Sequence, residues 1–200
     1  IPIIDNFNIP IIFYSVDEHL NPDINFIEDN IRDNLSIILA VNYFGVPSDW
    51  NSLLKLKSKY ECIIMEDNAH SLYGEHENIS FGNLGDISFN SLRKVLPVLS
   101  GSFLQFNNNI NLNDKFEKRF LNYSELKYSF RSLSRNNKIP KKISDDSPGI
   151  YDNIESIDYF SYKIYLAQKK NKENICRIRR DNYNFWLKYL SNSELEMFDT

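Results

Sequence analysis

Two side chains of opposite charge follow two apolar runs of this 200-residue chain, and their spacing suits one kind of chemistry. Asp67 comes just past a short apolar run that we expect to be a strand, and Lys94, preceded by Arg93, follows a second predicted strand. A lysine amine can form a Schiff base with an aldehyde, and a carboxylate can hold a ring nitrogen in its protonated form. These are the two groups that a pyridoxal phosphate enzyme requires.

A strand–helix–strand unit is predicted to position Asp67. We expect its elements at residues 36–41, 50–60 and 61–65, with both strands buried on two sides. Asp49 favours the positive N-terminus of the helix. Because the two strands of such a unit are parallel, the loops 42–45 and 66–74 open on the same edge of the sheet, where ligands bind in open α/β sheets. Asp67 is therefore predicted to lie at a ligand site.

Further elements are predicted on both sides of this unit. We expect strands at 11–16, 86–91 and 103–106, and helices at 25–34, 114–133 and 159–190. The polar stretch 134–150 is typical of a linker. The chain begins without Met and stops without a closing element, so we expect it to be a fragment of a longer protein.

The composition argues against several functional classes of protein. A net charge of −4 argues against nucleic acid as a partner, and the mixed charges at 169–181 indicate a solvated helical face rather than a functional basic patch. Cys62 and Cys176 are far apart, which favours reduced thiols in the cytoplasm, and no His/Cys cluster suggests a metal. The longest apolar run, 37–41, is too short for a bilayer, and no signal peptide is visible.

Each candidate site residue could instead have an ordinary structural role. Asp67 could be an ordinary turn or helix-capping residue, and His70, on the same predicted loop, a structural histidine. Lys94 is flanked by apolar residues, so we expect it to be partly desolvated, which favours the neutral, nucleophilic amine. The hydroxyls of Ser88 and Ser91 could bind a cofactor phosphate or belong to ordinary strand residues.

Three segments together resemble a known family. VNYFGVPSDW is similar to a V-H-x-Y-G-x-P-A-D-M motif with Asn42 in place of the histidine, and MEDNAHSLYG to a strand followed by E-D-x-A-(Q/H). GNLGDISFNS is similar to G-x-x-G-D-x-x-x-F-S-F, which leads to a Schiff-base lysine. Over about residues 10–106 the chain thus resembles the DegT/StrS-type sugar aminotransferases, which are fold-type-I pyridoxal phosphate enzymes.

The resemblance implies a role for five residues. It makes Asp67 the partner of the pyridine nitrogen, with Ala69 beside it in the same motif. His70 is then next to the ring hydroxyl, and Ser91 contacts the phosphate. Lys94 becomes the Schiff-base lysine, which also moves a proton between the substrate carbon and the cofactor.

The lysine segment departs from the family pattern. Lys94 comes eight residues after Asp86, where the family has about ten, and Val95 stands where Asn is usual. Residues 99–102, LSGS, replace G-E-G-G. A two-residue deletion that retains the lysine is one explanation, and loss of the Schiff-base function is the other.

The resemblance also implies a fold and a domain plan. We expect an α/β fold whose mostly parallel sheet is flanked by helices, as in the large domain of fold-type-I enzymes, with the start of a small C-terminal α+β domain. Residues 1–133 would be a partial cofactor-binding domain, 134–158 a linker and 159–200 a helical return to a truncated small domain.

The implied activity is transfer of an amino group, with glutamate as donor, to a keto-sugar linked to a nucleotide. Relatives of this kind make surface polysaccharides or antibiotic sugars and act as homodimers, which we also expect here, in the cytoplasm. One alternative is a catalytically silent relative that serves as a binding or partner subunit. Another is a pyridoxal phosphate sugar dehydratase, in which histidine replaces the lysine; Lys94 argues against it.

Overall fold

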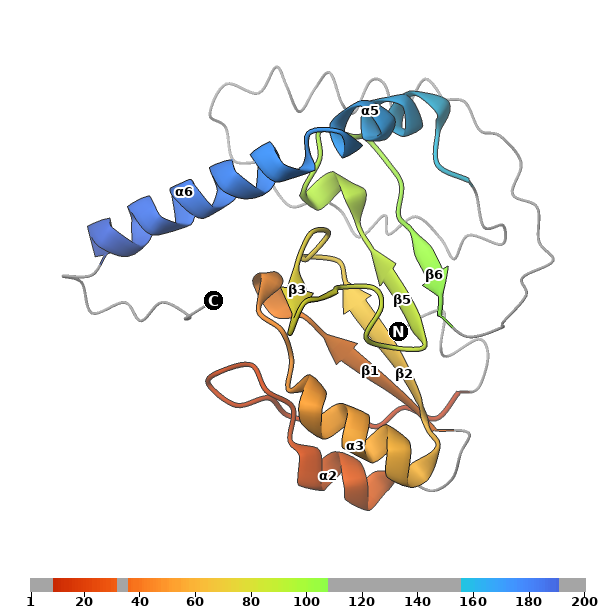
Figure 1. Cartoon of the computed structure of the whole chain (residues 1–200). Helices are drawn as coiled ribbons and strands as arrows, with labels where there is room; N and C mark the ends of the chain where they lie inside the picture. The colour runs from red at the N-terminus through yellow and green to blue at the C-terminus, as the bar shows by residue number, and fades with distance from the viewer. Residues whose placement is uncertain (1–8, 32–35, 108–155, 191–200) are drawn as a thin grey trace, which may run out of the picture.

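A four-stranded sheet forms the centre of the protein, whose computed structural model describes residues 9–31, 36–107 and 156–190 (Figure 1). Its strands, in spatial order, are β1 (Ile37–Val41), β2 (Ile63–Asn68), β5 (Ile87–Asn90) and β6 (Leu104–Phe106). The first three are parallel, and β6 is antiparallel to β5. This mostly parallel arrangement confirms the predicted α/β class.

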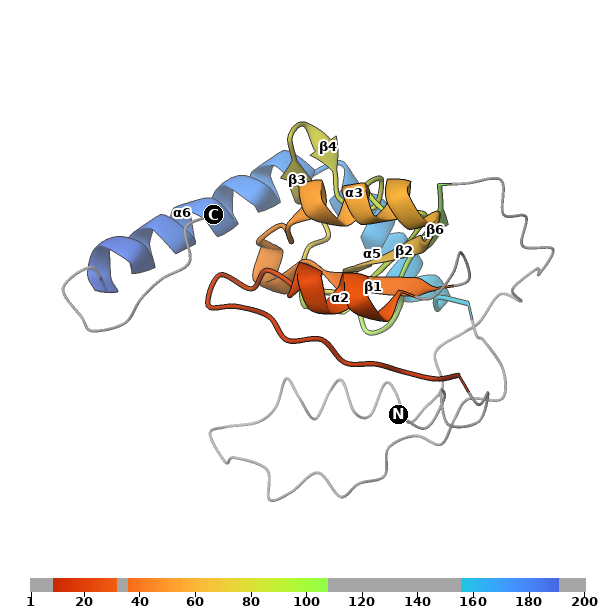
Figure 2. The same ribbon diagram turned by 90° about the horizontal axis from the view of Figure 1, so that it is seen from below.

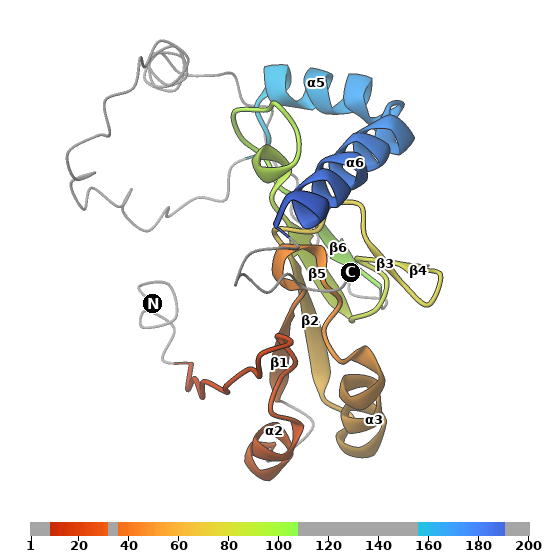
Figure 3. The ribbon, with the colours of Figure 1, turned by 90° about the vertical axis from the view of Figure 1, so that its left-hand side faces the viewer.

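Helices, short turns and a hairpin precede, connect and follow these strands. They are α2 (Ile24–Asn30), α3 (Trp50–Tyr60), α5 (Tyr159–Lys169) and α6 (Lys172–Leu190), with 3-10 turns η1 (Tyr43–Gly45) and η2 (Leu92–Lys94) and a hairpin of β3 (Glu75–His76) and β4 (Ile79–Ser80). Helix α3 lies against one face of the sheet, and α5 lies beyond the carboxyl end of β5 (Figures 1 and 3). No helix in the described ranges is long and apolar enough to cross a membrane.

The predicted strand–helix–strand unit is β1–α3–β2. Helix α3 begins where the Asp49 carboxylate accepts a hydrogen bond from the Ser52 backbone N–H at 3.1 Å, as an N-cap does. Its apolar side packs onto one face of the sheet. The buried side chains of this core include Trp50, Leu53 and Leu56 from α3 and Ile38, Ala40 and Ile64 from the strands.

The prediction that β1 is buried on both faces is wrong. Its side chains alternate, and Ile37 and Leu39 are 57% and 43% exposed. Helix α3 covers the face that carries Ile38 and Ala40, and among the described residues the opposite face is left partly open. An unbroken apolar run cannot reveal which of its two faces the rest of the chain will cover.

Residues 11–16 do not form the predicted strand. They run along the side of the sheet away from α3 (Figures 2 and 3), where Val16 makes a single bridge to Pro22. The Tyr14 hydroxyl donates to the Leu39 carbonyl at 2.5 Å, so a side chain rather than a backbone ladder joins this segment to β1. A strand exists only with a neighbour that supplies backbone hydrogen bonds, which no local sequence pattern can guarantee.

The bounds of the other predicted elements agree with the structure to within a few residues, wherever the structure describes them. The helix predicted at 25–34 is α2, which ends at Asn30 because Ile31 is extended, and 159–190 is divided into α5 and α6 around Lys170 and Asn171. The predicted helix 114–133 and the polar stretch 134–150 lie outside the described residues. The domain boundaries at 133 and 158 therefore stay predictions.

A second apolar cluster lies beyond the carboxyl end of β5. Leu92, Leu96 and Val98 are buried there, packed against Ile164 of α5 and Ile175 of α6. The segment that follows Lys94 is therefore held by the two C-terminal helices.

A buried carboxylate fastens the same segment to the start of α5. Asp158 is fully buried, accepts a hydrogen bond from the Ser161 N–H at 2.8 Å and another from the Ser100 hydroxyl. The Ser161 hydroxyl in turn accepts from the backbone N–H groups of Leu99 and Ser100, at 3.1 and 3.2 Å. Gly101 packs closely against Ile157, and only glycine fits there, because a Cβ would lie 2.5 Å from the Ile157 side chain.

We expect Asp158→Ala to destabilise the protein by about 1–2 kcal/mol at pH 7, because a helix cap and a buried hydrogen bond are lost. Burial raises the pKa of the Asp158 carboxyl, but hydrogen bonds from Ser100 and Ser161 lower it by more. The pKa in the folded protein is therefore below the ordinary 3.8. Since the folded pKa is the lower one, the carboxylate stabilises fully above 3.8, and the effect is lost as the pH falls through the folded value. Urea unfolding of wild type and variant at pH 7 and near pH 3 measures this, and a difference that stays constant would contradict it.

Candidate functional site

Asp67 lies at the carboxyl edge of the sheet, as predicted, but inside the strand rather than just past it. Strand β2 continues to Asn68, and Asp67 is paired with Val41 of β1 and Phe89 of β5. Its Oδ1 accepts the Ala69 N–H at 2.8 Å, which is the ordinary turn role. Among the described residues Oδ2 accepts no hydrogen bond. This oxygen of the partly buried carboxylate is therefore available to a ligand that donates a hydrogen bond.

The structure brings His70 and Lys94 together. The Lys94 Nζ lies 2.7 Å from the His70 Nε2, although the two residues are 24 positions apart. Lys94 is the last residue of η2, and its N–H bonds to the Ser91 carbonyl at 3.3 Å. The amine is thus held by an imidazole on the loop that follows Asp67, which neither the order nor the spacing of the residues could show.

The predicted partial desolvation of Lys94 does not hold in the single chain, where the side chain is exposed. The reason is the shape of η2. Leu92 of this turn is fully buried and anchors it, whereas Arg93 and Lys94 are turned outward. Apolar neighbours in the sequence therefore do not enclose the lysine.

Ser91 is partly buried at the start of η2, and its hydroxyl makes no capping hydrogen bond. Within the described residues no hydrogen bond joins Asp67 to Lys94, or either of them to the Ser91 hydroxyl. The five predicted site residues thus form two linked pairs, Asp67 with Ala69 and His70 with Lys94, with Ser91 next to the second pair.

Asn42 has a role that sequence reasoning missed. It is fully buried, and its Nδ2 donates to Asn68 Oδ1 at 2.7 Å and to Glu66 Oε1 at 3.3 Å. Its Oδ1 accepts from the Ser48 N–H and the Trp50 Nε1–H, both at 3.0 Å. All hydrogen-bonding capacity of this amide is used, so it ties the ends of β1 and β2 to the start of α3. The only signal in the sequence was that Asn stands where the motif has His.

Glu66 is the second missed residue. It is fully buried on the face opposite Asp67, and its Oε1 accepts the Gly82 N–H at 2.8 Å. Its Oε2 accepts the N–H groups of Leu84 and Gly85, at 3.2 and 3.3 Å. A Cβ on Gly85 would lie 2.8 Å from the Ile64 carbonyl, so only glycine allows this close approach. Glu66 thereby holds the turn from which β5 runs toward Ser91 and Lys94.

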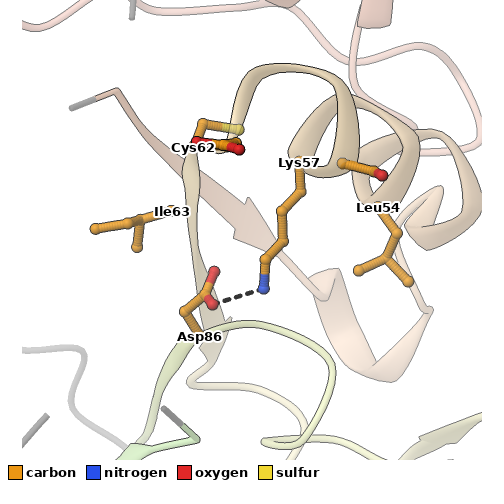
Figure 4. Close-up of a pocket in the computed structure, with 7 residues that line it drawn as sticks. Leu54, Lys57, Cys62, Ile63 and Asp86 are labelled. Carbon is orange, nitrogen blue, oxygen red and sulfur yellow. Dashed lines mark hydrogen bonds and ion pairs between the residues drawn. The ribbon is translucent and has the colours of Figure 1, made fainter. Parts of the chain in front are cut away.

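An open cavity of about 570 Å³ lies at the other edge of the sheet (Figure 4). It is lined by Leu54, Lys57, Ser58, Glu61, Cys62, Ile63 and Asp86. The Asp86 Oδ1 pairs with Lys57 Nζ at 2.5 Å and its Oδ2 accepts the Ile64 N–H at 2.9 Å, so the polar groups bind one another. The cavity lies at the amino end of β2, away from Asp67.

The described residues contain no cluster of His, Cys, Asp or Glu that could hold a metal ion. Cys62 and Cys176 are free thiols. Cys62 is buried directly before β2, and burial raises its pKa. It is a core residue rather than a reactive thiol.

The residues at the carboxyl edge fit pyridoxal phosphate. The cofactor presents a ring nitrogen that can carry a proton, and Asp67 Oδ2 is an acceptor without a partner among the described residues. It presents an aldehyde, and Lys94 is an accessible amine oriented by His70. It presents a phosphate, and Ser91 offers a hydroxyl that makes no capping bond.

Solved structures share this fold. The E. coli GDP-4-keto-6-deoxy-D-mannose-3-dehydratase with bound hydrated PLP is 20% identical, with a TM-score of 0.65 over 95% of this chain and 50% of that chain. Helicobacter pylori PseC, an aminotransferase of pseudoaminic acid biosynthesis, is 16% identical, with a TM-score of 0.64 over 96% and 48%. A putative sugar aminotransferase from Streptococcus pneumoniae, Spr1654, is 15% identical, with a TM-score of 0.65 over 96% and 50%. The chain thus has the fold of these enzymes and spans about half their length.

Sequence comparison gives the family directly. An uncharacterised Methanocaldococcus jannaschii protein, MJ1066, is 29% identical over 91 residues, which cover 45% of this chain and 24% of that protein. The sequence model of one family of pyridoxal phosphate enzymes matches residues 3–108, which include all five predicted site residues and more than half of the chain. The chain belongs to the DegT/DnrJ/EryC1/StrS aminotransferase family.

Proposed function

We propose that the whole protein is a pyridoxal phosphate-dependent aminotransferase that moves an amino group from glutamate to a keto-sugar linked to a nucleotide. The observation that carries this proposal is the contact of Lys94 Nζ with His70 Nε2 at 2.7 Å, at the sheet edge where Asp67 lies. This contact supports the proposal because open α/β sheets bind ligands at this edge, where a lysine amine would be needed.

The cofactor of this family supplies an aldehyde for covalent attachment and a ring that withdraws electrons from a substrate carbanion. In our proposal Asp67 Oδ2 would accept a hydrogen bond from the protonated ring nitrogen, while its Oδ1 stays fixed by the Ala69 N–H. His70 Nε2 orients the Lys94 amine, which moves a proton to and from the substrate carbon. Ser91 donates its hydroxyl to the phosphate.

The substrate class is supported by relatives of the same fold. One is a GDP-4-keto-6-deoxymannose-3-dehydratase variant with bound GDP-perosamine, and another is an aminotransferase of pseudoaminic acid biosynthesis. A role in polysaccharide or antibiotic sugar synthesis and a homodimer are parts of the proposal that come from the family resemblance. The two free thiols agree with the proposed location in the cytoplasm.

The test is to mix the full-length protein with pyridoxal phosphate. We expect a near-visible absorbance band that borohydride abolishes, and after reduction a Lys94-containing peptide that carries the cofactor mass. With glutamate and GDP-4-keto-6-deoxy-D-mannose as a probe, an aminotransferase yields 2-oxoglutarate and an amino sugar that keeps its other hydroxyls. A product that lacks a hydroxyl oxygen would indicate the dehydratase, and absence of the band would indicate the silent partner subunit.

A further inference from the structure

Phe44 is an exposed aromatic residue with a strained backbone. It is 69% exposed and lies in η1 with φ 56° and ψ 13°, the left-handed region that bulky residues avoid. The turn is closed by the Val46 N–H, which donates to the Tyr43 carbonyl at 2.9 Å. Since strain of this kind persists at functional sites when surrounding structure enforces it, the residue calls for an explanation.

The ring of Phe44 packs against the His70 imidazole. Their centroids are 5.2 Å apart and their planes differ by 3°, which is an offset parallel stack. The same imidazole presents Nε2 to Lys94 Nζ at 2.7 Å. One face of the ring therefore meets an aromatic neighbour while its edge meets the amine.

We propose that Phe44 is a positioning residue that acts on Lys94 through His70. A partly buried imidazole on a loop can rotate about two bonds, and only some rotations direct Nε2 toward the amine. The parallel phenyl ring restricts the plane of the imidazole and keeps this edge pointed at Lys94. This inference rests on the proposed function, because it gives the Phe44–His70–Lys94 arrangement its use.

The strain supports the assignment. Glycine would adopt the backbone of residue 44 at lower cost, so the phenyl ring is what phenylalanine adds to this turn. Because the ring is largely in water, its burial stabilises the fold little. Its ring contacts are the parallel stack on His70 and a tilted, more distant one with the preceding Tyr43, at 6.4 Å between centroids.

The experiment compares Phe44→Gly with Phe44→Tyr in the full-length protein. Phe13→Gly is the matched control, since Phe13 is also an exposed phenylalanine, 75%, in an irregular segment. Three quantities are measured: thermal unfolding, the ¹⁵N signals of the His70 ring in cofactor-free protein, and the maximal rate at which Lys94 captures pyridoxal phosphate.

We expect Phe44→Gly to unfold at the wild-type temperature or higher, to shift the His70 ring signals, and to lower the maximal capture rate about three- to tenfold. Phe44→Tyr keeps the ring and should match wild type in all three, and Phe13→Gly should leave the His70 signals and the capture rate unchanged. If Phe44→Gly is less stable than wild type, Phe44→Leu replaces it, with the same expected shift of the His70 ring signals and the same fall in the capture rate.

Unchanged His70 signals and capture rate in the ringless variants would overturn the inference. Failure of the proposed function is distinguishable, because wild type itself would then capture no cofactor. In that case the His70 signals of the cofactor-free protein still decide whether Phe44 orients the imidazole.

Discussion

Replacement of Lys94 by alanine should abolish covalent attachment of pyridoxal phosphate and lower amino transfer by about a thousandfold or more, because the nucleophile and the proton carrier are lost together. The fold should survive, since the side chain is exposed and, among the described residues, its side-chain hydrogen bond is with His70. The measurements are the near-visible absorbance band, the cofactor mass on the Lys94 peptide after borohydride, and 2-oxoglutarate formed from glutamate.

Arg93→Ala is the matched control for this prediction. Arg93 is the preceding residue of the same turn η2, and it is likewise basic and exposed. We expect it to retain the covalent linkage. A band that survives Lys94→Ala but disappears in another lysine variant would show that the lysine was assigned wrongly. This outcome would contradict both explanations of the altered lysine segment, retention of the Schiff-base function at Lys94 and its loss.

Replacement of Glu66 by glutamine should lower the free energy of unfolding by about 3 kcal/mol. Each carboxylate oxygen accepts backbone N–H groups of the turn 82–85, and the residue is fully buried. An amide has one acceptor oxygen, so its NH₂ group must face at least one of these donors. The unpaired donors remain buried away from water, and urea unfolding at neutral pH measures the cost.

Glu61→Gln is the control for Glu66→Gln, because Glu61 precedes the same strand but is exposed at the C-cap of α3. We expect its effect to stay within about 0.5 kcal/mol. Equal urea midpoints for the two variants would mean that the turn 82–85 does not depend on the buried carboxylate. In that case the pairing of β5 with β2 and the second apolar cluster would position Lys94 without help from Glu66.

Local chemistry explains why much of the fold was predictable. Helix α3 has an Asp49 cap and apolar residues at helical spacing, and both act within one or two turns of the chain. A strand, helix and strand in succession can pack in essentially one way, with parallel strands and a right-handed crossover. The carboxyl edge as the place of Asp67 follows from that topology, and only the end of β2 was misjudged.

Burial was less predictable, because it depends on what lies across from each residue. Ile37 and Leu39 belong to an apolar run but are exposed on the face that α3 does not cover. Residues 11–16 have strand character but make a single bridge. Lys94 has apolar neighbours in the chain, and η2 nevertheless turns it outward. Each error came from reading a neighbour in the sequence as a neighbour in space.

The sequence by itself determined the family, the α/β class and the residue types at the sheet edge, because motifs and periodicity are carried by residues close together in the chain. Only the tertiary structure decided which of them meet. It placed the imidazole of His70 against the amine of Lys94 and stacked Phe44 on that imidazole. It also buried Asn42 and Glu66 as the polar groups that join the strands to their loops. These contacts span up to 26 residues, and their geometry depends on how the strands and turns pack.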